Sequence, residues 1–310
     1  MRAISGPVCH LRFLAGDCMC VTRKAEKIGV WNALIGQKDQ MTNRPRGSLR
    51  HIAFCALFAA TVAASAHAPS LQAQNFDHSS FNAIVQTHST GKGVDYAAIK
   101  ADRASLDRYV AQLGTVSTTA FEKWSRADQI AFLLNAYNAI IIQQVIDDYP
   151  IERSARPAAM VRPANSVWQI DGFFDLLKHR VTDRDLTLDQ IEHEWLRPRF
   201  KEPRIHFALV CAAHSCPPLR REAYVAARLE AQLDDQARIF LNDRARNRFG
   251  EKDAQVSEIF KWFGSDFGTE QQLRTFLGRY LNPATAVRLR NDRYRITHLN
   301  YDWTLNDVAR

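Results

Sequence analysis

Residues 130–142, IAFLLNAYNAIII, form the stretch that decides the fold of this protein. Apolar side chains occupy nearly every side of a helix built from these residues, and such a helix is buried at the centre of a domain. Ser125 followed by Asp128 is typical of a capping box at the start of this helix, and Pro150 predicts its end. We therefore expect one long central helix that other elements cover.

The segments around this helix predict an α+β fold. Helical and strand-like patterns follow one another in blocks, without a regular alternation of strand and helix, so we expect a single domain whose central buried helix packs on a mixed or antiparallel sheet. The sequence RIHFALVC at 204–211 predicts a buried strand, and residues 167–181 predict paired strands around Asp171-Gly172. Residues 293–300 predict a last strand. Further helices are expected at 81–88, 106–113, 187–196, 223–243, 257–263 and 269–281.

Residues 41–73 resemble an export signal and not a folded domain. Arg44, Arg46 and Arg50 precede the apolar run IAFCALFAATVAA at 52–64, and small residues follow it as far as Ala73. That run is shorter than the roughly 20 residues that a membrane-spanning helix needs. We therefore expect a cleaved secretory signal at 41–73, a globular domain at 74–310 without a membrane span, and a periplasmic or secreted location. An uncleaved N-terminal anchor is the alternative.

Because secretory signals begin near the initiator methionine, residues 1–40 do not fit this interpretation. We expect translation to start at Met41, which makes residues 1–40 a misassigned extension.

The net charge of +8 comes mostly from this N-terminal region. Once the nine basic and three acidic residues of 1–73 are set aside, 32 Lys and Arg and 30 Asp and Glu remain. A nearly neutral domain offers no electrostatic argument for nucleic-acid binding. The expected partner is therefore a small molecule, a peptide or a component of the cell envelope.

Two cysteines remain after the signal, in the box HFALVCAAHSCPP at 206–218. An exported pair such as Cys211 and Cys216 is typical of a disulfide. Alternatively, Cys211 is a nucleophile and His206 its base, although an odd spacing along a strand places the two side chains on opposite faces. A zinc site formed by Cys211, Cys216, His206 and His214 is a third alternative, but this spacing matches no common zinc module. We therefore predict no metal and no cofactor.

Polar residues outside this box complete the candidate site. Glu192 is expected either to orient His206 or to tie its own helix to a neighbouring segment. Asn135 and Asn138 lie on one face of the central helix, where they form either a buried amide network or, with Ser215, hydrogen bonds to a substrate. We expect Glu192, His206, Cys211, Ser215 and Asn135 to lie around one cavity.

Four segments in order resemble the DUF547 family of unknown function. They are IAFLLNAYNAIII, LDQIEHEWLR, RIHFALVCAAHSCPPL and the terminal LNYDWTLN, and the resemblance covers about residues 90–305. Plant members of the family keep the first cysteine of the box and have serine at the second. This resemblance implies a common role for Cys211 rather than for Cys216, but it implies no particular reaction.

Two classes of function agree with these observations. The first is a thiol-dependent hydrolase or acyl transferase that acts on a peptide or amide, with Cys211 as its nucleophile. The second is a non-catalytic periplasmic binding module in which Cys211 and Cys216 form a structural disulfide.

Overall fold

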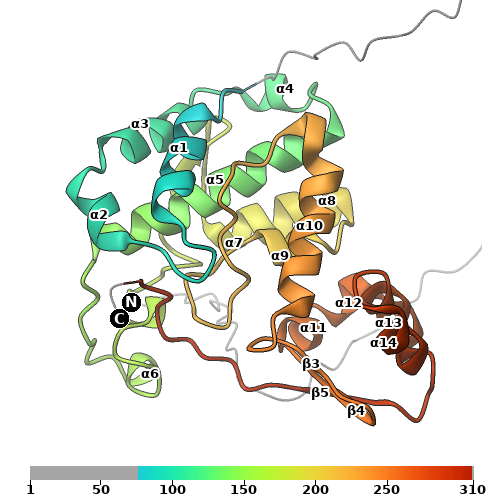
Figure 1. Ribbon diagram of the computed structural model, residues 1–310. Helices are drawn as coiled ribbons and strands as arrows, with labels where there is room; N and C mark the ends of the chain where they lie inside the picture. Colours follow the sequence, from blue (N-terminus) through green and yellow to red (C-terminus); the bar gives the residue numbers. More distant parts are fainter. Residues whose placement is uncertain (1–75, 309–310) are drawn as a thin grey trace, which may run out of the picture. The chain divides into compact units, whose positions relative to one another are not determined.

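The computed structural model describes residues 76–308, and the predicted signal and the extension before it lie outside these residues (Figure 1). The α-helices are α1 (Ser79–His88), α2 (Tyr96–Ala101), α3 (Ala104–Leu113), α4 (Thr118–Phe121), α5 (Arg126–Asp147), α6 (Pro157–Met160), α7 (Leu188–Gln190), α8 (Arg197–Phe200), α9 (Ile205–Ala208), α10 (Leu229–Asn242), α11 (Ile259–Trp262), α12 (Gly264–Phe267), α13 (Glu270–Gly278) and α14 (Pro283–Leu289). Short 3-10 helices form η1 (Val167–Gln169) and η3 (Ala226–Arg228), and η2 (Ile191–Leu196) is a π-helix. The strands are β1 (His179–Val181), β2 (Arg184–Leu186), β3 (Arg248–Phe249), β4 (Asp253–Val256) and β5 (Arg295–His298).

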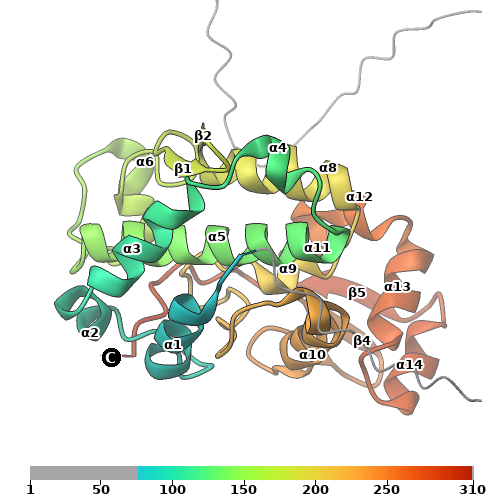
Figure 2. The same cartoon turned by 90° about the horizontal axis from the view of Figure 1, so that it is seen from above.

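The central helix is α5, and its prediction is confirmed. Ser125 accepts a hydrogen bond from the backbone N–H of Asp128 and so caps the helix at its start. The helix is long and apolar enough to cross a membrane, but 89% of its most apolar window is buried inside the protein, as in the core helix of a globular domain. Figure 2 shows α5 with β1, β2 and α4 on one side and α1 and α10 on the other.

The strands form two small sheets. β1 and β2 pair in an antiparallel hairpin, whereas β4 pairs with β3 antiparallel and with β5 parallel. The fold is thus α+β with a central helix, as predicted. The main neighbours of α5 are α2, α3, η2 and η3 rather than a sheet. Strands of two to four residues are too short to cover the apolar surface of a 22-residue helix, so other helices cover it.

The strand predicted at 204–211 is wrong, because this segment begins with α9 and becomes extended only at Leu209. The side chain of Asn138 accounts for the difference. Its amide donates to the carbonyl of Ala208 at 3.0 Å and accepts from the N–H of Val210 at 3.0 Å. These are backbone groups that a sheet would otherwise pair. A short apolar run does not by itself distinguish a buried strand from a buried helical turn.

The paired strands predicted around Asp171-Gly172 are also wrong. Gly172 does form a turn, with φ of 63°, and its carbonyl accepts the N–H groups of Leu176 and Leu177. The hairpin lies further along the chain, where β1 and β2 turn through Thr182 and Asp183, at φ of 50° and 56°. Two successive residues of positive φ match the twist of antiparallel strands. Thr118 holds this turn by donating to the carboxylate of Asp183.

Two apolar cores meet at α9. The larger core surrounds α5 and includes Ile205 and Ala208. The smaller core is rich in phenylalanine and lies among α10–α14 and β4, and it includes Phe207. The box that carries His206, Cys211 and Cys216 therefore begins at the junction of the two cores, which is where the candidate site lies.

Candidate functional site

The loop from Cys211 to Cys216 is held in a single conformation by its backbone. Ala212 has a left-handed conformation with φ of 58°, which costs a residue other than glycine ~1–2 kcal/mol. The terminal segment 302–306 lies alongside this loop. The backbone N–H of His214 donates to the carbonyl of Thr304 at 2.7 Å, and the backbone N–H of Asn306 donates to the carbonyl of Ala212 at 2.9 Å. On the other side, the buried guanidinium of Arg246 donates to the carbonyls of Cys216 and His214. The loop is therefore fixed from two sides.

The two thiols of this loop are free and in contact. The two Sγ atoms lie 2.8 Å apart in a hydrogen bond, and Sγ of Cys216 also accepts the backbone N–H of Cys211 at 2.7 Å. The hydroxyl of Tyr301 lies 3.2 Å from Sγ of Cys211. The sulfur of Cys211 therefore has two polar side-chain neighbours, one of which is a second thiol.

The environments of the two sulfurs differ. Cys216 is 2% exposed, whereas Cys211 is partly exposed. Burial raises the pKa of the Cys211 thiol, but the hydrogen bonds of Cys216, Tyr301 and the Ala213 backbone outweigh burial, and the pKa falls below its ordinary value. The pKa of Cys216 is raised well above its ordinary value, first by burial and then by the adjacent Cys211. Cys211 is therefore the sulfur that ionises more easily.

A second polar cluster surrounds His206. Its Nε2 lies 2.8 Å from Oδ2 of Asp266, and its Nδ1 lies 3.6 Å from Oε1 of Glu192. Arg197 binds the same Asp266 through two hydrogen bonds, of 2.7 and 3.0 Å. The ring of Phe263 stacks on the imidazole with centroids 4.0 Å apart. Glu192 therefore faces His206, which is the arrangement that a role in orienting His206 requires.

These contacts shift the pKa values of His206 and Asp266. Burial alone lowers the pKa of His206, but hydrogen bonds to Asp266 and Glu192 and their negative charges outweigh it, so the pKa is raised. The hydrogen bond from His206 and the charge of Arg197 hold the pKa of Asp266 well below its usual range. Glu192, Arg197, His206 and Asp266 thus link η2, α8, α9 and α12.

The two clusters are neighbours, but no hydrogen bond between Cys211 and His206 occurs among residues 76–308. Tyr137 of α5 lies near both: burial raises its pKa first, and the negative charges of Glu192 and Cys211 raise it further. On α11 and just after it, Trp262 contacts the ring of Tyr301, and the next residue, Phe263, covers His206. His206 and Glu192 thus belong to one cluster, while Cys211 and Ser215 belong to the neighbouring Cys211–Cys216 loop.

Asn135, Asn138 and Ser215 all bind backbone groups. Asn135 donates to the carbonyl of Tyr224 at 2.8 Å and accepts its N–H at 2.9 Å, while Asn138 binds the residues just before Cys211. The hydroxyl of Ser215 accepts the N–H of Asp302 at 2.9 Å. These contacts support the amide network that the sequence suggested, and the substrate-binding role of the three residues stays a prediction.

Tyr301, Asp266 and Tyr137 are functional candidates that the sequence did not single out. Tyr301 is part of the terminal segment LNYDWTLN, so its position in a family-like box was the available signal. Asp266 is 60 residues from His206 in the chain, and Tyr137 looks like one more apolar residue of the central helix. No local pattern indicates either of them.

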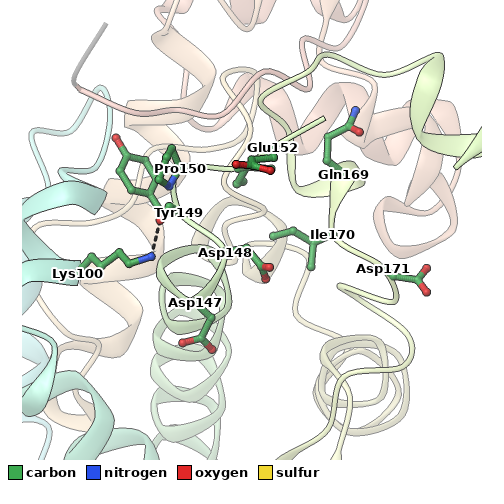
Figure 3. A pocket seen from close by; sticks show the side chains of 10 residues that line it. Lys100, Asp147, Asp148, Tyr149, Pro150, Glu152, Gln169, Ile170 and Asp171 are labelled. Carbon is green, nitrogen blue, oxygen red and sulfur yellow. Dashed lines mark hydrogen bonds between the residues drawn. The ribbon is translucent and has the colours of Figure 1, made fainter. Parts of the chain in front are cut away.

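Two hollows of about 420 Å³ each lie in the described part of the chain. The hollow in Figure 3 is at the carboxyl end of α5, where Lys100 donates to the carbonyl of Tyr149. Its lining includes the acidic side chains of Asp147, Asp148, Glu152 and Asp171. None of the predicted site residues is among the residues that line it. The other hollow includes Asp266 and reaches the second cluster from α12 and α13.

The zinc alternative required several of the box residues to converge on one point. Within residues 76–308, no three His, Cys, Asp or Glu side chains are arranged to hold a metal ion. Cys211 and Cys216 contact each other, whereas His206 binds carboxylates and His214 is exposed.

Comparison with known proteins identifies a family and no activity. No curated protein and no solved structure gave a significant match to this sequence. The profile of the DUF547 family, described as protein of unknown function, matches residues 121–241. The matched region contains α5, η2, α9, the Cys211–Cys216 loop and all but the last residue of α10, but ends before Asp266 and Tyr301. Residues 121–241 therefore match the DUF547 family, whose function is unknown.

Proposed function

We propose that this protein exchanges thiols and disulfides with a protein partner in the cell envelope, with Cys211 as the attacking sulfur and Cys216 as the resolving sulfur. The observation that carries the proposal is the contact of 2.8 Å between the Sγ atoms of Cys211, a partly exposed residue, and Cys216, a buried one. Thiol–disulfide exchange requires a thiolate that a partner can reach and a second sulfur close behind it.

The exchange takes place in two steps. The Cys211 thiolate attacks one sulfur of the partner's disulfide and forms a mixed disulfide with it. The partner's S–S bond breaks, and the other partner sulfur leaves as a thiolate that takes a proton from water. Cys216 then loses its proton to water and attacks Sγ of Cys211, which breaks the mixed disulfide and releases the second partner thiolate. The partner's disulfide is reduced by two electrons, and Cys211 and Cys216 are oxidised to a disulfide. In the reverse direction the same bonds oxidise a partner dithiol.

The pKa values of the two thiols suit this order of steps. Cys216 holds its proton while Cys211 is a thiolate, because burial and the neighbouring negative charge both raise its pKa. Formation of the mixed disulfide removes the charge on Cys211, so the pKa of Cys216 falls when its attack is needed. Tyr301 supports the thiolate through its hydroxyl.

A hydrolase or acyl transferase uses the same nucleophile but also needs a base beside it. Both ring nitrogens of His206, the expected base, face carboxylates and not Cys211: Nε2 lies 2.8 Å from Asp266 and Nδ1 lies 3.6 Å from Glu192. Acyl transfer therefore has less geometric support than exchange, and the two differ in their need for Cys216. The non-catalytic module with a structural disulfide differs from both, since its sulfurs would stay oxidised.

The test is the reaction of the reduced protein with 5,5′-dithiobis(2-nitrobenzoate), with peptides mapped by mass spectrometry. The wild-type pair is expected to release two thionitrobenzoate ions and to end as a Cys211–Cys216 disulfide. Cys216→Ser is expected to stop at a mixed disulfide on Cys211, and Cys211→Ser to react far more slowly because Cys216 is buried.

Four outcomes would overturn the proposal. The first is equal reaction rates for the two variants. The second is a wild-type product with two separate adducts and no internal disulfide. The third is hydrolysis of p-nitrophenyl acetate that depends on Cys211 and survives Cys216→Ser, which would favour acyl transfer. A native disulfide that mild reductants do not open would favour the binding module.

A further inference from the structure

A group of aromatic rings extends from the hydroxyl beside Cys211. We name Tyr301, Trp303, Trp262 and Trp168 the aromatic platform. The ring centroid of Tyr301 lies 4.6 Å from that of Trp303 and 4.7 Å from that of Trp262, and Trp303 continues the contact to Trp168 at 5.3 Å. Trp262 is 39% exposed. An aromatic surface therefore begins 3.2 Å from the sulfur, at the Tyr301 hydroxyl.

A positive charge lies on this platform. The guanidinium of Arg162 is 4.7 Å from the ring centroid of Trp168 and 5.8 Å from that of Trp303. Within residues 76–308 it forms no ion pair with a carboxylate, in contrast to Arg156, which binds Asp171 at 2.6 Å. Stacking on two indoles fixes the orientation of the guanidinium and leaves its N–H donors to a ligand.

The residues before Arg162 add apolar surface. Met160 and Val161, at the end of α6, are 56% and 84% exposed. An unpaired arginine beside aromatic and apolar side chains complements a ligand that joins a carboxylate to an apolar group.

We propose that the aromatic platform and Arg162 bind the thiol partner through a peptide segment in which an aromatic residue lies next to a carboxylate. Arg162 receives the carboxylate, and the indoles receive the aromatic ring. This inference rests on the proposed function, because the partner's sulfur must belong to a protein for a peptide segment to accompany it. Indole faces also bind sugars, but a neutral sugar leaves the charge of Arg162 without a partner.

The test measures binding without any thiol chemistry, in the Cys211→Ser protein. Tryptophan fluorescence is titrated with N-acetylphenylalanine, which has a carboxylate, and with its neutral amide. The acid is expected to bind at least about tenfold more tightly than the amide, as one charge-assisted contact requires. Arg162→Gln is expected to remove this preference, and Arg162→Lys to keep part of it.

A matched control is Arg199→Gln, which removes another arginine that stacks on an indole, that of Trp195, at 4.3 Å. It is expected to leave the preference unchanged. Equal affinity for the acid and the amide, or an unchanged preference in Arg162→Gln, would overturn the inference, as would quenching by chitotriose without binding of the acid. Because the titration uses Cys211→Ser, its failure leaves the exchange reaction to its own test, and failure of the exchange leaves the peptide site standing.

Discussion

At the scale of single residues, the candidate site depends on side chains that bind backbone groups. Asn135 and Asn138 are almost completely buried in α5, and each pairs one N–H and one carbonyl of a segment far away in the chain. A buried amide without partners would cost ~1–3 kcal/mol, whereas here each amide satisfies two backbone groups. The two residues therefore attach the central helix to the segments at 208–210 and 224.

Asn135→Leu tests this attachment. The substitution keeps the volume and leaves the N–H and carbonyl of Tyr224 without partners, so the free energy of unfolding should fall by ~1–3 kcal/mol. Urea denaturation measures the change, and Asn138→Leu should behave similarly through Ala208 and Val210. Unchanged stability, together with loss of the reaction with 5,5′-dithiobis(2-nitrobenzoate), would instead indicate that Asn135 binds the substrate.

At the scale of elements, the second cluster joins helices that the sequence does not connect. Glu192 comes from η2, Arg197 from α8, His206 from α9 and Asp266 from α12. A capping box in which Thr187 and Gln190 bind each other's backbone N–H groups starts α7, the first turn of the helix predicted at 187–196, and η2 follows it directly. The charged cluster then fixes how that segment meets α9 and α12.

This cluster predicts a dependence of stability on pH. The pKa of His206 is raised in the folded protein, so its protonated form stabilises the fold below the unfolded value of about 6.5, and this contribution is lost as pH rises through the folded value. The difference in unfolding free energy between wild type and His206→Gln should therefore be largest at pH 6 and decrease towards pH 9.

Denaturation at several pH values measures this difference, and a difference that grows with pH would contradict the prediction. His78 acts in a separate range. Burial lowers its pKa to about 4, so its contribution is present above pH 6.5 and is lost as pH falls towards 4. Because wild type and His206→Gln both contain His78, its contribution cancels in the difference between them.

At the scale of the whole molecule, the expected location and the proposed chemistry depend on each other. A dithiol that exchanges with protein disulfides belongs in a compartment where disulfides persist. The export signal predicted at 41–73 would deliver residues 74–310 to such a compartment, with Cys211 and Cys216 as the two cysteines of that part of the chain.

Processing of the native protein tests the predicted export. The mature N-terminus is expected between His67 and Gln74, in the soluble periplasmic or secreted fraction, because small residues follow the apolar run at that distance. N-terminal sequencing and fractionation measure this. Recovery from membranes alone, resistant to salt and alkaline washing, would indicate an uncleaved anchor, and a chain that retains residues 1–40 would exclude a start at Met41.

The sequence by itself determined the central helix with its cap, the α+β class and the match of residues 121–241 to the DUF547 family. Each of these depends on side chains that are neighbours in the chain or recur at a helical period, so composition and spacing are sufficient. The sequence also identified Glu192, His206 and Cys211 as polar residues within conspicuous boxes, without showing which of them would meet.

Only the tertiary structure decided how those residues are paired. RIHFALVC is apolar enough for a strand or a helix, and the choice rests on Asn138, which lies 70 residues away from Ala208 and takes the backbone groups that a sheet would use. Asp266 reaches His206, and Tyr301 reaches Cys211, across 60 and 90 residues. Contacts over such separations depend on how the two cores pack together, and no local pattern in the chain encodes that packing.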